Sequence, residues 1–321
     1  MKSKIIPIAG DASFRKFYRL ILKKNKILVL SKKEKYKNLV AYLAINKFLR
    51  KNKVLAPKFY LINYQKGMAI IEDFGNVSFY DVLSKRKNKF LIYKKLIKFL
   101  LKIQNIKTKI KIKSINNKFH LMNKYSNKYL FEESNLFFDW YLPLFLSKKK
   151  ALNVKTKSRN ILLKLYNKLN FSNSYFVHRD YHVQNLMKVG NKIGLIDSQD
   201  ALIGNPAYDL VSLVDDVRIK TSIKLKNQIF HYYLKNSKKS YSNNYQKFLE
   251  DFNILSVQRS LKIIGIFSRL FKRDRKKQYL KFIPYTWKLL EMRMSSNIFF
   301  QLRKILDENV PKKMRKKILY K

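Results

Sequence analysis

Residues 174–210 constrain the fold more than any other part of the chain, because two short apolar runs in them each lead into a loop with an acidic side chain. The runs cover residues 175–177 and 193–196 and are bounded by Ser, Asn or other polar positions. Such runs are typical of short buried strands. Asp180 follows the first run and Asp197 ends the second. The sequence therefore predicts two carboxylates side by side at the rim of a sheet.

The spacing of the polar side chains in this stretch indicates phosphoryl transfer. His178, Asp180 and Asn185 form the pattern H-x-D-x4-N, and Asp197 follows about a dozen residues later, in the order of a kinase catalytic loop and its metal aspartate. Asp180 is expected to orient and deprotonate a hydroxyl, while Asn185 and Asp197 hold Mg²⁺, which needs only one or two carboxylates beside phosphate oxygens. A lone H-x-D is more often a turn with an aspartate cap, but the Asn, the second run and the second Asp together favour catalysis.

Other polar residues of the stretch have more than one interpretation. His178 is expected to orient the catalytic loop rather than to bind zinc, because the chain has no Cys and this stretch is predicted to be a loop. His182 is either a substrate contact or an exposed loop residue. Gln199, with Asp200, either reaches substrate or metal-bound water or caps the boundary between lobes. Asp209 is expected to be structural, tying a helix start to the catalytic loop, with a substrate contact as the alternative.

HRDYHVQNLM, IDSQDA and YDLVSL resemble the catalytic segment of the aminoglycoside phosphotransferase superfamily, bacterial small-molecule kinases with the protein-kinase fold. GDASFRKFYRL, LFFDWYLP and QRSLKIIGIFSRLFKRDRKKQYLKFIP are similar to the anomeric sugar kinases that phosphorylate N-acetylmuramate and N-acetylglucosamine at the C1 hydroxyl in cell-wall recycling. The resemblance implies an ATP- and Mg²⁺-dependent kinase with an α+β, two-lobed fold. Residues 1–75 would form a β-rich ATP-binding lobe, and residues 76–321 a mostly helical lobe with the catalytic loop and the substrate site.

The resemblance also implies nucleotide contacts in the first lobe. GDASF is not a glycine-rich phosphate loop, and alone it is typical of an ordinary turn. Within the resemblance, the backbone amides of Ala12 and Ser13 and the Ser13 hydroxyl would contact phosphate. The segment from Glu72 to Phe74 would run past the adenine, and a polar turn after a strand is the alternative.

The cation that pairs with the nucleotide phosphates stays open at this point. Lys32 and Lys33 lie near the position of the kinase lysine, but not in a VAIK-like context. The helix predicted over residues 38–51 carries no acidic residue to pair with either lysine. Arg15 and Arg19, on the first predicted strand, are rivals for the role.

Two positions farther along the chain are candidates for substrate contacts. Asp139 lies in the apolar run LFFDWYLPLFL, where an acid without a partner is costly, so it is either a buried structural acceptor or a ligand of sugar hydroxyls. On a helix over residues 258–270, Arg259, Lys262 and Arg269 share one sector. Such a sector usually faces solvent. The alternative from the resemblance is that Arg259 binds a carboxylate or phosphate of the sugar.

The remaining patterns predict the elements around these positions. FYRLIL and KILVL read as strands separated by the turn KKNK, and KFYLIN with GMAIIEDFG as a hairpin. FLIYKKLIKFLLKIQ has helical periodicity. Residues from 76 to about 169 read as helical, with KTKIKIKSINN as a Lys- and Asn-rich connection.

The net charge is extreme, with 71 Lys and Arg against 20 Asp and Glu, or +51. The basic residues are spread through every segment, which fits a compositional bias towards A·T-rich codons as well as a binding surface. Nonspecific affinity for polyanions follows in either case. No apolar stretch is long enough for a membrane span or a secretory signal, so the expectation is a cytoplasmic protein with ATP and a small sugar as partners. The alternatives are a kinase of aminoglycoside or choline type and a kinase-like scaffold that binds RNA or acidic membrane.

Overall fold

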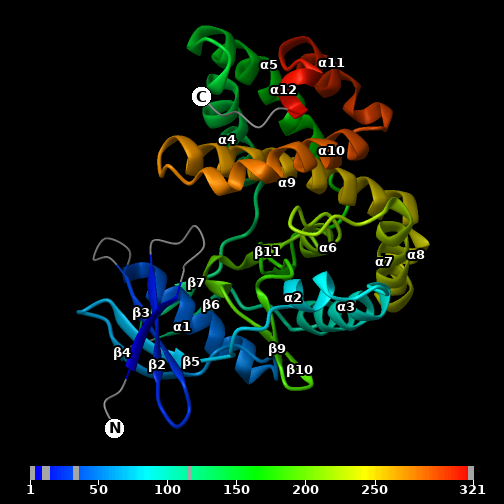
Figure 1. Cartoon of the computed structure of the whole chain (residues 1–321). Coiled ribbons are helices and arrows are strands. Elements are labelled where there is room, and N and C mark those ends of the chain that lie inside the picture. The colour runs from blue at the N-terminus through cyan, green and yellow to red at the C-terminus, as the bar shows by residue number, and fades with distance from the viewer. Residues whose placement is uncertain (1–3, 9–14, 32–35, 115–117, 317–321) are drawn as a thin grey trace. The chain divides into compact units, whose positions relative to one another are not determined.

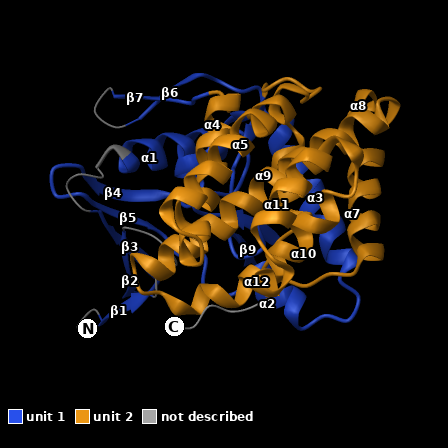
Figure 2. Cartoon of the chain, turned by 90° about the horizontal axis from the view of Figure 1, so that it is seen from above, with its two compact units in different colours: residues 1–123, 175–203 blue, residues 124–174, 204–321 orange. Residues whose placement is uncertain are grey.

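The computed structural model describes residues 4–8, 15–31, 36–114 and 118–316. The predicted contacts of Ala12, Ser13 and Lys32 lie outside these ranges. The chain forms two compact units, residues 1–123 with 175–203, and residues 124–174 with 204–321 (Figures 1 and 2). The first contains a small antiparallel sheet and the second is helical, as the α+β prediction requires. The predicted lobes divide the chain differently, and their boundary near Gly75 stays a prediction.

The sheet of the first unit has five antiparallel strands in the order β1-β2-β3-β5-β4. Both predicted strand pairs are confirmed, since β2 pairs with β3 across the KKNK turn, and β4 pairs with β5 as a hairpin. The strands are β1 (Lys4–Ile8), β2 (Lys16–Ile21), β3 (Lys26–Leu30), β4 (Phe59–Asn63) and β5 (Met68–Glu72).

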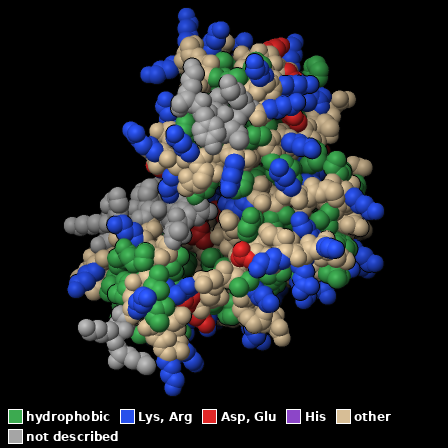
Figure 3. Space-filling model, viewed as in Figure 1, with side chains coloured by type: hydrophobic (Ala, Val, Ile, Leu, Met, Phe, Trp, Pro, Cys, Tyr) green, Lys and Arg blue, Asp and Glu red, His purple; other side chains and the backbone are tan. Residues whose placement is uncertain are grey.

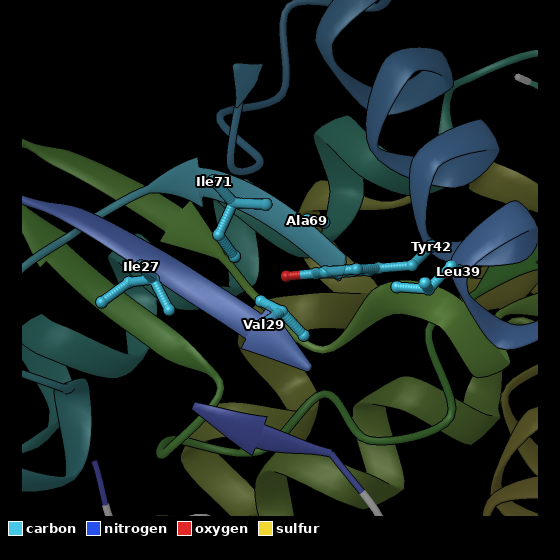
Figure 4. Close-up of a cluster of buried hydrophobic side chains, with 6 residues drawn as sticks. All are labelled: Ile27, Val29, Leu39, Tyr42, Ala69 and Ile71. Atoms are coloured by element: carbon cyan, nitrogen blue, oxygen red, sulfur yellow. The ribbon is translucent and has the colours of Figure 1, made fainter. Parts of the chain in front are cut away.

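Helix α1 (Tyr36–Lys51) covers one face of this sheet. It begins two residues before the predicted helix and ends at the same residue. Alternate residues of β3 and β5 are buried, as the two-residue repeat of a strand requires. They pack with Leu39 and Tyr42 from α1, and the Tyr42 ring extends from the helix towards the sheet (Figure 4). The buried strand residues are Ile27, Val29, Ala69 and Ile71.

The catalytic segment forms two separate ribbons. Strand β8 (Tyr175–Val177) pairs with β11 (Leu202–Gly204), and β9 (Leu186–Val189) pairs with β10 (Lys192–Leu195). The two predicted strands are therefore confirmed, but the expectation that their acidic residues share one sheet rim is wrong. Strand β9 was not predicted. It forms because the chain reverses at Gly190, whose φ of 56° suits glycine, and returns as an antiparallel hairpin.

Two helices follow the sheet, α2 (Phe79–Ser84) and α3 (Phe90–Gln104), and α3 matches the predicted amphipathic helix. The segment read as a polar connection contains β6 (Lys111–Lys113), which pairs with β7 (Phe119–Leu121). The helical prediction is wrong for this hairpin. Ile and Lys alternate in KIKIK with a period of two, which suits a strand with one buried face.

The second unit is built around the long helix α9 (Tyr245–Lys272), seen in Figure 1. Gly265 lets α9 approach a π-helical turn, η2 (Phe137–Tyr141), because a Cβ at this position would lie 2.2 Å from the Leu136 carbonyl carbon. The other helices are α4 (Asn127–Leu136), α5 (Lys148–Asn167), α6 (Ala207–Val214), α7 (Ile223–Asn236), α8 (Lys239–Asn243), α10 (Ile283–Arg293), α11 (Phe300–Asn309) and α12 (Lys312–Lys316). Short 3₁₀ turns are η3 (Leu142–Leu144), η4 (Ser198–Asp200) in the first unit, η5 (Lys277–Phe282) and η6 (Asn297–Phe299).

The basic residues do not gather in one stripe on the face shown in Figure 3, where Lys and Arg side chains are scattered among polar and hydrophobic ones. Acidic side chains are few on the same face. Such a distribution is the one that a compositional bias would produce. Within the described part of the chain, no helix is long and apolar enough to cross a bilayer.

Candidate active site

The loop that begins at His178, after β8, is fixed to two other segments by hydrogen bonds from its own side chains. His178 is fully buried, and its Nε2 donates to the carbonyl oxygen of Ile196 at 3.0 Å. This contact joins the start of the loop to the residue just before Asp197. Tyr181 is also fully buried and donates its hydroxyl to the Leu96 carbonyl of α3 at 2.8 Å. The loop is thus fixed on one side to the β10 segment and on the other to a helix.

Asn185 connects the three residues of the predicted catalytic set. Its Nδ2 donates to the Asp180 carbonyl at 3.0 Å, and its own carbonyl accepts from the Ile196 amide at 3.1 Å. The backbone of Ile196, next to Asp197, is therefore paired directly with Asn185. Asp180, Asn185 and Asp197 lie close together in one compact unit, although no single sheet edge carries them.

Asp197 stands at the end of β10 in a left-handed conformation, with a φ of 64°. Leu195 anchors the strand through its amide, which donates to the Leu55 carbonyl at 2.8 Å. On the other side of Asp197, the Ser198 hydroxyl donates to Asn46 Oδ1 of α1 at 2.6 Å. These bonds fix the Asp197 backbone between two segments from early in the chain, and a left-handed non-glycine residue held in this way is common at functional sites.

The Asp197 carboxylate receives two hydrogen bonds, and both reach Oδ1. Arg15 Nη2 donates at 2.8 Å, and Gln199 Nε2 donates at 3.1 Å. Gln199 also donates to Asp200 Oδ2 at 3.0 Å. Gln199 therefore contacts Asp197 and Asp200, whereas its contact with substrate or metal-bound water and its role at the lobe boundary stay predictions.

The guanidinium of Arg15 is nearly buried and lies beside two rings. Its centre is 5.5 Å from the ring of Phe17 and 5.1 Å from that of Tyr42. Burial raises the pKa of the Tyr42 hydroxyl to about 12, with Arg15 acting in the opposite direction, so the hydroxyl is neutral at physiological pH. Tyr42 and Asn46 are neutral groups of α1, and the sequence patterns did not indicate either of them as a site residue.

The residues around Asp197 suit Mg²⁺ better than a metal bound by protein side chains alone. Within residues 4–8, 15–31, 36–114 and 118–316, no three His, Asp or Glu side chains gather to hold an ion. Asp197 is 43% exposed at its side chain, and in the described part of the chain only its Oδ1 accepts hydrogen bonds, so Oδ2 can take another cation. Asn185 uses Nδ2 as a donor, which leaves Oδ1 as the ligand atom. One carboxylate and one amide oxygen are the protein share that Mg²⁺ needs beside phosphates.

The segment predicted to pass the adenine has its side chains engaged within the protein. Glu72 accepts from the Lys58 amide and from Arg50 Nη1, each at 3.1 Å. Phe74 packs on Gly194, where a Cβ would lie 2.7 Å from its ring. Backbone recognition of adenine is compatible with both positions and stays a prediction.

Asp139, Arg259 and Asp209 lie in the second unit. Asp139 is 44% exposed and pairs with Lys155 at 2.7 Å, so its interpretation as a buried acceptor is wrong. The expected solvent-facing sector of α9 is wrong as well, because Arg259 is buried beside Tyr208, and Lys262 pairs with the buried Glu133 at 2.8 Å.

Asp209 lies in the first turn of α6 and is fully buried, in keeping with a structural role. His182 is buried rather than exposed, and its Nε2 lies 3.4 Å from Asn185 Nδ2. Contacts of Asp139, Arg259 and His182 with a sugar stay predictions.

Comparisons with known proteins agree with the predicted phosphotransferase family. Residues 4–247 match the model of the phosphotransferase enzyme family. N-acetylmuramate/N-acetylglucosamine kinase of Neisseria meningitidis serogroup B is 26% identical over 280 residues, which cover 86% of this chain and 81% of that protein. The enzyme of the same name from Pseudomonas aeruginosa is 26% identical over 294 residues, covering 90% and 83% of the two chains.

Solved structures share the fold. The ADP-bound aminoglycoside phosphotransferase APH(2'')-Ib superposes with a TM-score of 0.61 at 13% identity, covering 90% of this chain and 92% of that one. An ethanolamine kinase of Plasmodium vivax superposes with a TM-score of 0.62 at 13% identity, covering 93% and 84%. These likenesses confirm the kinase-like α+β fold. With a family match over most of its length and this fold, the chain belongs to the phosphotransferase enzyme family.

Proposed function

We propose that the protein transfers the γ-phosphoryl group of ATP to the anomeric C1 hydroxyl of an N-acetylated amino sugar, N-acetylmuramate or N-acetylglucosamine. The observation that carries the proposal is the hydrogen-bonded link from Asp180 through Asn185 to the Asp197 segment. This link would hold the proposed base, Asp180, at a fixed spacing from the proposed cation site at Asn185 and Asp197. The names of relatives that cover most of this chain support the choice of sugar.

In the proposed reaction, Asp180 accepts the proton of the C1 hydroxyl while the hydroxyl oxygen attacks the γ-phosphorus. The bond between the γ-phosphorus and its bridging oxygen breaks, and ADP leaves with the electron pair. His178 keeps the loop in place through its bond to Ile196. Mg²⁺, held by Asp197 and Asn185, would neutralise charge on the phosphates when bound.

The charge of the chain supports a neutral or anionic acceptor. An aminoglycoside or choline is cationic and favours an acidic site, whereas this chain carries +51. N-acetylmuramate carries a carboxylate, and N-acetylglucosamine is neutral. A cytoplasmic location, where ATP is abundant, is part of the same proposal.

ADP release tests the proposal directly. The acceptors are N-acetylmuramate, N-acetylglucosamine, an aminoglycoside and choline, each with ATP and Mg²⁺. We expect turnover with an amino sugar and a loss of about a thousandfold or more in Asp180→Asn. Turnover with only a cationic acceptor would contradict the sugar assignment. Turnover that survives in Asp180→Asn would contradict the assigned base.

A further inference from the structure

A kinase site needs a cation of its own against the nucleotide phosphates, and in protein kinases this is a lysine paired with an acid on the following helix. Helix α1 has the sequence YKNLVAYLAINKFLRK and contains no acidic residue. The usual lysine–glutamate pair therefore cannot form on α1. A cation for this role needs its anionic partner from another element.

Arg15 has such a partner. It begins the segment that leads into β2, and its guanidinium lies 2.8 Å from Asp197, which follows β10 far along the chain. Only 8% of its side chain is exposed. The rings of Phe17 and Tyr42 hold the guanidinium by cation–π contacts, which orient it without adding a competing negative charge.

Arg19, on β2 itself, is engaged elsewhere. It donates through Nε and Nη2 to the two carboxylate oxygens of Asp73, at 2.5 and 3.0 Å. Its Nη1 donates to Asn76 Oδ1 at 2.5 Å. A bidentate pair with a further amide contact fastens β2 to the segment after β5, so Arg19 is a structural residue.

The contact between Arg15 and Asp197 has a consequence for nucleotide binding. Asp197 is the proposed metal ligand, so a divalent cation and the Arg15 guanidinium attract the same carboxylate. When Mg²⁺ shares the charge of Asp197, the hold on Arg15 weakens, and the phosphates that accompany the metal offer new acceptors. Arginine suits this exchange because its planar donors bind carboxylate and phosphate alike.

We propose that Arg15 is the residue that pairs with the nucleotide phosphates, and that Asp197 holds it ready until a metal–nucleotide complex arrives. The inference rests on the proposed function and adds to it a phosphate-binding residue outside the kinase lysine position. Arg15 and Asp197 then form a pair that exchanges partners on binding. The proposal predicts that substitution of Arg15 lowers the affinity for ADP but leaves the affinity for adenosine unchanged.

Calorimetric titration with ADP and with adenosine separates the contribution of the phosphates to binding from that of the nucleoside. In Arg15→Ala we expect ADP affinity in Mg²⁺ to fall about 10- to 100-fold, the range for a hydrogen bond to a charged group, and adenosine affinity to stay unchanged. Unchanged adenosine affinity also shows that the site is folded. Arg15→Lys, which keeps the charge and should keep the fold, is expected to lose less. Arg19→Ala, on the adjoining strand β2, is the matched control, and Lys32→Ala tests the rival lysine.

A double-mutant cycle without metal tests the exchange of partners. In EDTA, Asp197→Asn removes the negative charge that holds Arg15 and leaves only a neutral acceptor, so Arg15 exchanges more readily to phosphate. We therefore expect ADP affinity to rise on the order of tenfold when Arg15 is present and much less in the Arg15→Ala background. If Asp197→Asn acted only by removing a charge that repels the ADP phosphates, the gain in ADP affinity should be at least as large in the Arg15→Ala background. Equal gains would overturn the exchange.

The two proposals fail in different ways. A wild-type protein that binds no ADP would contradict the proposed function itself. A wild-type protein that binds ADP, with Arg15→Ala and Arg15→Lys unchanged in ADP affinity, would overturn only the role of Arg15. Loss of ADP affinity in Lys32→Ala with no loss in Arg15→Ala would return the role to the lysine.

Discussion

Two aspartates, one in each compact unit, bind arginine in contrasting ways. Asp215, at the end of α6, has a side chain only 3% exposed and accepts from Arg293 Nε at 2.9 Å, Lys226 Nζ at 3.0 Å and the Ser256 hydroxyl at 2.7 Å. Asp197 is 43% exposed, and its two hydrogen bonds share one oxygen. One carboxylate is enclosed by partners on both oxygens, whereas the other is half-exposed and, among the described residues, is bonded through Oδ1 alone.

The difference separates a structural charge from one that can accept a ligand. Burial alone would raise the pKa of Asp215, but Lys226 and Arg293 hold it well below its ordinary value. Its ionised form is therefore part of the folded core, and the loss of its charge would leave two buried cations uncompensated. Within the described part of the chain, Asp197 pairs with one cationic group, Arg15, so a second cation can bind there without disrupting a buried ion cluster.

The largest expected effect is on catalysis, in Asp197→Asn. The metal site contributes several kcal/mol of transition-state stabilisation, so kcat should fall about a thousandfold. Asparagine tolerates the left-handed conformation, and its Oδ1 can still accept from Arg15. The free energy of unfolding should therefore change by less than about 1 kcal/mol. Sugar-dependent ADP release and chemical denaturation measure the two quantities, and a strongly destabilised variant would refute the distinction between the two aspartates.

Asp215→Asn should show the reverse pattern. Removal of one partner from a buried ion cluster typically costs about 3–5 kcal/mol, so we expect a comparable loss in the free energy of unfolding by urea denaturation. Molecules that remain folded should keep a kcat within a few-fold of wild type. Unchanged stability would mean that the enclosed cluster contributes nothing.

The pH dependence of stability sharpens the contrast. The pKa of Asp215 is lower in the folded protein than its unfolded value of about 3.9. Its stabilising contribution is therefore complete above that value and declines as pH falls towards the folded pKa. The difference in unfolding free energy between wild type and Asp215→Asn should shrink by about 1 kcal/mol between pH 6 and pH 3. Asp139→Asn, which alters a half-exposed carboxylate, is the control and should show a small difference throughout.

The smallest effect is expected at the exposed pair of Lys155 and Asp139. Although the two atoms are only 2.7 Å apart, their side chains are 30% and 44% exposed. Exposed pairs contribute about 0–1 kcal/mol, and salt screens them. Lys155→Ala should shift the urea midpoint only slightly, and less still at high salt. A loss as large as that of Asp215→Asn would show that distance, rather than enclosure, decides the strength of these pairs.

Local patterns were sufficient to predict much of the first unit. The turn-bounded strands β2 to β5, helix α3 and strands β8 and β10 all followed from periodicity and from spacing within a few residues. The β6–β7 hairpin was overlooked because its lysines suggested a polar connection, although the Ile–Lys alternation was present. Strand β9 was missed because it is a short run between two stronger signals.

Contacts between distant segments were beyond such patterns. Arg15 meets Asp197 across 182 positions, and Arg293 meets Asp215 across 78. A charged face on a predicted helix suggests solvent, yet Lys262 is buried against Glu133. Which charges are enclosed depends on tertiary packing, so the sequence indicated the candidate catalytic residues but not the partners that distinguish Asp197 from Asp215.

The position of the transferred phosphate tests the central claim most directly. N-acetylglucosamine labelled with ¹³C at C1 is incubated with the protein, ATP and Mg²⁺, and the product is observed by ³¹P and ¹³C NMR spectroscopy. The account predicts a new sugar phosphate whose phosphorus couples to the labelled C1. A phosphate on another carbon, or no sugar-dependent phosphate signal with N-acetylglucosamine or with N-acetylmuramate labelled in the same way, would contradict it.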